Sequence, residues 1–423
     1  MTVHYEPFSA EVRDDPYPYY ARLRDEAPLY FAEQAQAWCV SRFDDVRAVL
    51  RDPERFSSDA MRTFLMGVPP GPDGANDPAA AQRMLQVAQA LPFSMQELIT
   101  SRNLISEDPP RHGVLRSLVN RGFTPRRIAA WEPRLRAVAE ECMAKLRHRS
   151  EFDLVTELAI PLPVRIITEM LGVEAERQAD FKTWSDQLVA GSTGSGRGDD
   201  LRESSFGPAM GALCRYVQRV AARRRQAPGD DLISVLLTAQ DGEAELTDAE
   251  LSFFVMLLLV AGNETTTNLI GNATHALLRH PEQLARVRAD RELLPALVEE
   301  ALRWDSPVQF VFRRTTCDVE IAGGRIPANA YVIALIGSAN RDERTFGRTA
   351  ANFDVTRESQ GHLSFGLGNH FCLGAALARL EGQLALGALI DELPRLEPRD
   401  GRVTFIDSFL VRGPQSLPLR RAA

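Results

Sequence analysis

Hydrophobic residues recur at helical spacing over most of the chain, and strand-like alternation is confined to short regions. The clearest helical stretches are residues 129–147, 292–304 and 374–393. Alternation occurs in residues 318–326, 331–335 and 403–411. There is no internal repeat, and no linker is long enough to separate two domains. We therefore expect a mainly α fold with a smaller β-rich lobe, in which residues 1–423 form a single domain.

One predicted helix is long enough to cross the whole molecule. Thr247 and Glu250 form a capping-box pattern at its start, and Pro281 stops it after His280. About 30 residues at 1.5 Å each give roughly 45–50 Å. Residues 251–260 are apolar on every face, which predicts burial, but residues 263–268 (NETTTN) are all polar. Polar residues within a buried helix are costly unless something uses them, so this segment is a candidate functional site.

The composition is that of a water-soluble globular protein. Hydrophobic residues make up 44% and charged residues 25%, and the net charge of -8 argues against a nucleic-acid binder. Acids and prolines throughout residues 1–30 are not typical of a secretory signal, and the longest apolar run, residues 253–262, is about half a membrane span. We therefore expect a cytoplasmic protein without a membrane anchor. Residues 66–79 and 191–200, which are rich in small residues, predict loops that act as lids or binding segments.

The five cysteines do not indicate a disulfide framework or a structural zinc site, since their number is odd and no C-x-x-C occurs. Cys372, however, lies in the sequence FGLGNHFCLG, residues 365–374. Two close glycines permit a tight turn that lets the backbone approach a flat ligand. The helix that follows offers amides and a dipole that favour a thiolate, the form of cysteine that binds iron. A lone cysteine is more often simply buried, but the six fixed positions of F-G-x-G-x-H-x-C-x-G favour an iron ligand.

These residues resemble the haem-binding loop of the cytochromes P450, and other motifs extend the resemblance along nearly the whole chain. Residues 261–266 (AGNETT) look like the oxygen-binding segment of that family, and residues 300–303 (EALR) look like its E-x-x-R helix. Residues 106–112 together with Arg116 are similar to the segment that binds a haem propionate in bacterial members. The resemblance implies the fold of a soluble bacterial cytochrome P450, haem b (iron protoporphyrin IX) as cofactor, and Cys372 as the ligand of its iron.

The resemblance also implies roles for residues around the haem. Glu264 and Thr265 would relay protons to iron-bound dioxygen, and a local distortion of the helix is typical of such sites. The structural alternative is that Thr265 bonds the carbonyl four residues earlier and Glu264 meets a buried base. Two haem propionates require cations, although a lone histidine more often has a capping or surface role. The expected haem contacts are His112, Arg116, Ala261, Arg313, Phe365, Gly366, His370, Cys372 and Gly374.

Glu300 and Arg303 are three residues apart on one helix, and the resemblance implies a buried structural network for them without a part in the chemistry. The third member of that network is usually an arginine before Phe-Asp, a place that Asn352 occupies here. An amide cannot replace a guanidinium charge, so the network must be neutral or receive its charge from elsewhere.

Substrate contacts are harder to assign, because an apolar residue is more often core than pocket. We expect them from residues 66–93 and from Val308, Gln309, Phe310, Val311, Ser408, Phe409 and Leu410.

Together these features predict a haem–thiolate monooxygenase that inserts one atom of dioxygen into an apolar small molecule. The glycines of residues 191–197 and 366–368 match neither a phosphate loop nor a dinucleotide fingerprint, so electrons should come from a separate ferredoxin and ferredoxin reductase, or a flavodoxin system. Two alternatives stay open: a peroxide-driven peroxygenase on the same fold, and a non-catalytic haem protein that binds a ligand. Retention of Glu264 and Thr265 disfavours both. We expect no nucleic-acid or membrane partner.

Overall fold

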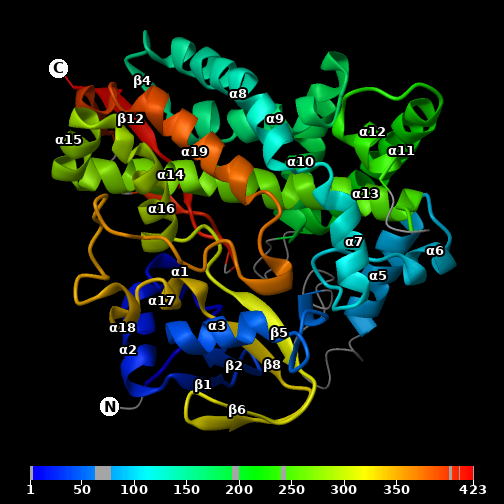
Figure 1. The fold of residues 1–423 in the computed structure, drawn as a ribbon, viewed down its shortest axis with the longest axis horizontal. Helices are drawn as coiled ribbons and strands as arrows, with labels where there is room; N and C mark the ends of the chain where they lie inside the picture. The colour runs from blue at the N-terminus through cyan, green and yellow to red at the C-terminus, as the bar shows by residue number, and fades with distance from the viewer. Residues whose placement is uncertain are drawn as a thin grey trace.

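The longest helical path in the computed structural model runs through the middle of the molecule (Figure 1). The structure describes residues 3–61, 78–192, 200–239, 244–399, 403–408 and 410–422. The path comprises α13 (Asp248–Leu257), the π-helical segment η4 (Leu258–Gly262) and α14 (Asn263–Arg279). Thr247 and Glu250 form the predicted capping box, and α14 ends at His280, directly before Pro281. Among the described residues this is the one helix with the length and hydropathy of a membrane span, a test that the core helix of a soluble protein also passes.

Six helices pack directly against this central path, and their apolar side chains form one core cluster with it. They are α9 (Pro161–Met170), α10 (Gln178–Ser192), α11 (Asp200–Gln226), α15 (Pro281–Ala289), α16 (Leu294–Trp304) and α19 (Ala375–Leu389). Helix α8 (Pro125–Leu146) packs against α19 and begins at Pro125, where the Thr124 side chain caps it by accepting from the Arg127 N–H. The expected helices at residues 129–147, 292–304 and 374–393 correspond to α8, α16 and α19.

The remaining α-helices are α1 (Ala10–Asp14), α2 (Tyr17–Glu26), α3 (Phe43–Arg51), α5 (Pro78–Ala90), α6 (Met95–Thr100), α7 (Arg111–Asn120), α12 (Leu232–Leu237), α17 (Ile336–Ala339) and α18 (Glu343–Phe346). One further π-helical segment is η2 (Val155–Ala159), and the 3-10 turns are η3 (Ala175–Arg177), η5 (Arg291–Leu293), η6 (Gly368–His370) and η7 (Leu393–Arg395).

The β-rich lobe lies below the helices in Figure 1, together with α1, α2 and α3. Its main sheet has the order β1-β2-β8-β5-β3, in which only β2 and β8 are parallel. The strands are β1 (Leu29–Ala32), β2 (Ala37–Val40), β3 (Phe56–Ser57), β5 (Val311–Thr315) and β8 (Tyr331–Ala334). A hairpin of β6 (Val319–Ile321) and β7 (Gly324–Ile326) turns at Ala322 and Gly323, both with positive φ. The mainly α fold with a smaller β-rich lobe is confirmed.

Two small sheets lie near the C-terminus of the chain. Strand β12 (Pro418–Arg421) pairs with both β4 (Glu151–Asp153) and β9 (Leu396–Pro398), while β10 (Thr404–Phe405) pairs with β11 (Pro414–Ser416). The strand expected over residues 403–411 is wrong in extent: of the residues described there, only Thr404–Phe405 form a strand, and Val411 makes an isolated bridge with Val308. Ser408 donates no ladder bond, because its backbone N–H bonds Ile406 and its hydroxyl accepts from the Val411 N–H.

The expectation that residues 251–260 are buried on every face also needs correction. Phe253, Met256, Leu257 and Val260 are only half-buried, and Ala261 is exposed. These positions follow helical spacing, so they form one stripe along the central path, and Glu264 continues it. A stripe of open apolar side chains inside a core helix is typical of a helix that lines a ligand site.

Candidate active site

The loop that carries Cys372 is closed by its own backbone. The Cys372 N–H donates to the Phe365 carbonyl at 2.8 Å, and the Gly366 N–H donates to Leu363 at 2.8 Å. Gly366 and Gly368 have φ of 68° and 70°, a left-handed conformation that favours glycine. A Cβ on Gly368 would also stand 3.0 Å from the Leu50 carbonyl at the end of α3. The two glycines are therefore required by the turn, as the sequence indicates.

The Cys372 thiol is half-buried and accepts a hydrogen bond from the Gly374 N–H. Burial raises its pKa, whereas this N–H and the charges of Arg116 and Arg379 act in the opposite direction. Bonding to a metal cation would deprotonate such a thiol outright. The thiols of Cys39 and Cys214 also have pKa values raised by burial, and both are fully buried in apolar clusters. Cys372 is thus the cysteine equipped to hold a metal as thiolate.

Four basic side chains gather beside this loop, although they come from α7, β5 and the loop itself. The His112 and His370 ring centroids lie 4.2 Å apart. Burial, Arg313 and His112 lower the pKa of His370 to about 3. Burial and the Arg116 charge lower that of His112. Arg313 is 5% exposed, and burial lowers its pKa to about 10 despite the nearby carboxylate of Asp108. The four residues expected to meet haem propionates are therefore brought together.

These four basic side chains carry more hydrogen-bond donors than the described residues have acceptors for. Nε2 of His112 and Nε2 of His370 are buried without a hydrogen-bond partner among these residues. The Asp108 carboxylate is shared with Ser57 and the Ser58 N–H, at 2.5 and 2.9 Å. A Cβ on Gly262 or Gly374 would meet nothing within 4 Å. Two buried imidazole nitrogens without partners and the buried guanidinium of Arg313, beside a half-buried thiol, fit a flat cofactor that brings two carboxylates, as haem does.

The polar segment of the central helix begins where η4 ends, so the predicted helix distortion is present. Thr265 Oγ1 donates to the Ala261 carbonyl at 2.7 Å, which is the bond that the structural alternative expects. The buried base that this alternative expects for Glu264 is not found among the described residues. Burial alone raises the pKa of Glu264 to about 7. The segment therefore presents a carboxyl group that can hold or release a proton near neutral pH.

Three partners in this region lie on other elements and were not predicted. Glu381 of α19 is 3% exposed and bonds the Thr266 hydroxyl, and burial raises its pKa to about 8. Ser185 of α10 accepts from Asn263, and the Ala159 carbonyl of η2 accepts from Thr267. Only Glu381 has a sequence signal: it interrupts the apolar face of the helix at residues 374–393.

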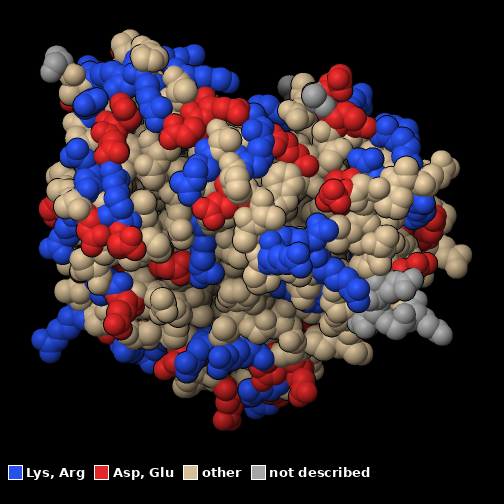
Figure 2. Space-filling view, turned by 45° about the horizontal axis from the view of Figure 1, so that its top comes forward, with Lys and Arg blue, Asp and Glu red and all other residues tan. Residues whose placement is uncertain are grey.

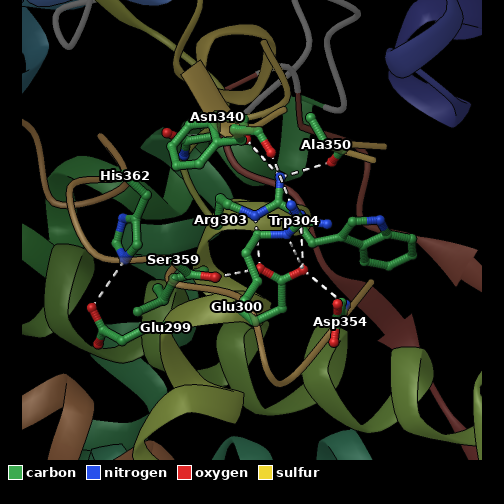
Figure 3. A network of polar contacts seen from close by, with 12 residues as sticks. Glu299, Glu300, Arg303, Trp304, Asn340, Ala350, Asp354, Ser359 and His362 are labelled. Atoms are coloured by element: carbon green, nitrogen blue, oxygen red, sulfur yellow. Dashed lines mark hydrogen bonds and ion pairs between the residues drawn. The ribbon is translucent and has the colours of Figure 1, made fainter. Parts of the chain in front are cut away.

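Glu300 and Arg303 form a bidentate pair at 2.7 and 2.8 Å with no exposed surface (Figure 3). Arg303 also donates to the carbonyls of Asn340 and Ala350 at 2.8 Å and of Asn352 at 3.1 Å. The positive charge that Asn352 lacks is supplied by Arg357, whose Nε lies 3.5 Å from the Glu300 carboxylate. The network therefore holds the chain between α17 and the cysteine loop, and its charge comes from elsewhere, as the sequence requires.

A second network lies beside it. Arg379 of α19 binds Glu299 through two hydrogen bonds of 2.6 and 2.9 Å, and His362 Nε2 lies 3.3 Å from the same carboxylate. Burial would raise the pKa of Glu299, but His362 and Arg379 lower it to about 2. The Arg379 guanidinium lies 4.5 Å from the centroid of the Phe365 ring, so this network packs against the first residue of the cysteine loop.

The expected substrate contacts divide into two groups. Gln309 is buried, donates to the Ser306 carbonyl and accepts from the Tyr20 hydroxyl, and Phe310 packs against Phe8 and Phe312. Both side chains therefore contact the N-terminal residues Tyr20 and Phe8 and do not form an open apolar surface. Val308, Val311 and Leu410 are half-buried. Phe409 lies outside the described residues, as do residues 66–77 of the expected loop.

Comparison with known proteins agrees with this geometry. A family model described as Cytochrome P450 matches residues 210–417. The chain is 39% identical over 411 residues to Cytochrome P450 107B1 of Saccharopolyspora erythraea, covering 96% of this chain and 94% of that one. It is 38% identical over 424 residues to Vitamin D(3) 25-hydroxylase of Pseudonocardia autotrophica, covering 99% and 96%.

Solved structures give the same result. The crystal structure of CYP109E1 from Bacillus megaterium in complex with corticosterone superposes with a TM-score of 0.83 at 36% identity, covering 98% of this chain and 100% of that one. These likenesses agree with the Cys372 loop, the four basic side chains beside it and the distorted central helix. They show that the chain belongs to the cytochrome P450 family of haem b-dependent monooxygenases.

Proposed function

We propose that the chain is a dioxygen-dependent monooxygenase that oxidises an apolar small molecule with electrons from a separate ferredoxin system. The observation that carries the proposal is the acid–hydroxyl pair of Glu264 and Thr265 at the end of η4. A carboxyl group with a pKa of about 7 can deliver protons at neutral pH, and reduction of dioxygen to water consumes protons. A non-catalytic haem protein has no need of such a pair, and in a peroxygenase the hydrogen peroxide brings the protons itself.

Each residue of the site has a role in this proposal. Haem iron bound by a thiolate supplies dioxygen binding and favours O–O cleavage. Cys372 Sγ would be the protein ligand, and the Gly374 N–H would stabilise its negative charge. His112, Arg116, Arg313 and His370 would bind the propionates, with Phe365, Gly366, Gly374 and Ala261 at the faces of the ring. Glu264 would hold the proton, and Thr265 would pass it on by turning its hydroxyl from the Ala261 carbonyl.

The substrate we propose is apolar and lies against the open stripe of the central path. Phe253, Leu257 and Val260 of that stripe, together with Val308, Val311 and Leu410, offer apolar surface. The relatives support a steroid-like substrate, since one is named a vitamin D(3) hydroxylase and another binds corticosterone. Corticosterone is therefore a suitable first probe. We also propose that the enzyme acts in the cytoplasm.

Thr265→Ala tests the function directly. The variant should bind haem and corticosterone as the wild type does, because its hydroxyl bonds only its own helix. It should divert electrons from product to hydrogen peroxide, and product formation should fall by about 10²- to 10⁴-fold if proton transfer becomes limiting. The measurement is product and peroxide per electron pair, with a surrogate ferredoxin and ferredoxin reductase. Ser252→Ala, which removes a hydroxyl bonded to its own helix at Asp248, is the control. An unchanged ratio in Thr265→Ala would argue against the relay.

A further inference from the structure

Asn263 is the first residue of α14 and directly precedes Glu264. Its side chain is 6% exposed, and Nδ2 donates to Ser185 Oγ at 3.2 Å. Ser185 has no exposed surface and belongs to α10, which packs against η4. A hydrogen bond between two buried side chains therefore joins the start of α14, where Glu264 and Thr265 lie, to the neighbouring helix α10.

The same residue is connected in the opposite direction. Thr267 lies one turn further along α14, and its Oγ1 is 3.5 Å from Asn263 Oδ1 and 3.0 Å from the Ala159 carbonyl. Ala159 ends η2, and the residue four positions later is Pro163, which has no N–H to donate to that carbonyl. Thr267 supplies the missing donor, and the longer contact with Asn263 Oδ1 is the weaker arm of the same shared hydroxyl proton. Three side chains thus connect α10, the junction of η4 with α14, and η2.

Packing alone does not require these polar groups. Leucine has nearly the shape of asparagine and would fill a buried site in this apolar cluster without needing a partner. A buried amide that loses its partner, by contrast, destabilises the protein. The polar arrangement also lies immediately beside the turn that carries Glu264 and Thr265, where the helix departs from regular geometry.

We infer that Asn263 is a positioning residue, which fixes the turn carrying Glu264 and Thr265 relative to α10 through Ser185 and relative to η2 through Thr267. A displacement of α10 then reaches the acid–hydroxyl pair through one hydrogen bond. The inference rests on the proposed proton relay for its effect on catalysis, but its structural content can be measured without turnover.

The test compares Ser185→Ala with the double variant Ser185→Ala/Asn263→Leu, and Ser252→Ala serves as the matched control on the same central path. The haem-loaded proteins are reduced and exposed to carbon monoxide, and the C–O stretching band is recorded by infrared spectroscopy. Melting temperature and hydrogen peroxide released per electron pair are measured on the same samples. Thr265→Ala is included as the reference for the relay.

Ser185→Ala should lower the melting temperature, shift or split the C–O band and raise the peroxide yield severalfold, because Asn263 loses its acceptor on α10. The double variant should recover the melting temperature, since both polar partners are gone, but the band and the peroxide yield should stay altered. Recovery of all three by the double variant, or a Ser185→Ala spectrum equal to that of Ser252→Ala, would overturn the inference. If Thr265→Ala leaves the peroxide yield unchanged, the relay fails, while the C–O band still decides whether Asn263 positions the turn.

Discussion

At the scale of single residues, three buried or half-buried glutamates around the site show how a carboxyl group depends on its partners. Burial alone acts on the Glu264 carboxyl group, and it raises the pKa to about 7. Glu381 has a single hydroxyl partner, Thr266, which only partly offsets burial, and its pKa rises to about 8. Glu299 has His362 and Arg379, and its pKa falls to about 2. The first two carboxyl groups can therefore gain or lose a proton near neutral pH, whereas the Glu299 carboxylate stays charged there.

Glu381 leads to a prediction about stability and pH. Its folded pKa of about 8 lies above the ordinary value of 4.5, so the folded protein binds the proton more tightly than the unfolded chain does. The stability that the protonated form contributes is complete below about pH 4.5 and is lost as pH rises through about 8. Glu381→Gln cannot lose a proton, so its melting temperature should exceed that of the wild type increasingly from pH 6 to pH 9. A difference independent of pH would mean that Glu381 does not titrate in this range.

Cys372 leads to a prediction about the iron ligand. Reduced protein exposed to carbon monoxide should show the red-shifted Soret band of thiolate ligation, and Cys372→Ser should abolish it. Cys39→Ser and Cys214→Ser should leave the band in place, because both thiols are buried in other clusters. The absorption spectrum measures the outcome. A thiolate band that survives in Cys372→Ser would place the ligand elsewhere.

At the scale of elements, the sequence predicts structure well where the cause is local. The capping box at Thr247 and the stop at Pro281 both set helix ends where expected, because each acts within one turn. The strand expected over residues 403–411 is largely absent, since alternation alone does not provide a partner strand. The partners Ser185, Ala159 and Arg357 could not be predicted, because they come from segments distant in sequence.

The Glu300–Arg303 network gives a prediction at this scale. Arg303→Leu removes the bidentate partner of a fully buried carboxylate and leaves it only the weaker Arg357 contact, so it should cost about 3–5 kcal/mol, with faster haem loss. Arg357→Gln removes a weaker contact, 3.5 Å from Glu300, and bonds to the Phe346 and Thr349 carbonyls, so about 1–2 kcal/mol is expected. Arg22→Gln breaks an exposed pair with Glu26 and should change stability by less than about 0.5 kcal/mol. Urea unfolding and haem retention measure whether the three variants lose stability in this order. Equal unfolding midpoints for Arg357→Gln and Arg22→Gln would show that Arg357 is not part of the network.

At the scale of the whole molecule, the distribution of charge is uneven. The chain carries a net charge of -8, yet residues 111–127 contain five arginines and no acid. Figure 2 shows a blue patch right of the centre, in the region of α7 and the start of α8. Arg126 is exposed, and neither it nor Arg127 takes part in an ion pair with the described residues. Arg116 of the same segment is near enough to Cys372 for its charge to act on the thiol. The basic surface therefore lies on the side of the molecule that carries Cys372.

This surface predicts where the electron donor binds. An acidic ferredoxin should approach the patch faster at low salt, since complementary charge accelerates encounter and is screened over about 10 Å at 0.1 M. Arg126→Glu/Arg127→Glu should slow the first electron transfer and flatten its dependence on ionic strength, with corticosterone binding unchanged. The control is Arg286→Glu/Arg288→Glu, which changes the charge equally on α15, an exposed helix on the other side of the molecule (Figure 1). Stopped-flow reduction across a salt series measures both. Equal rates and salt slopes for the two variants would move the docking site away from residues 111–127.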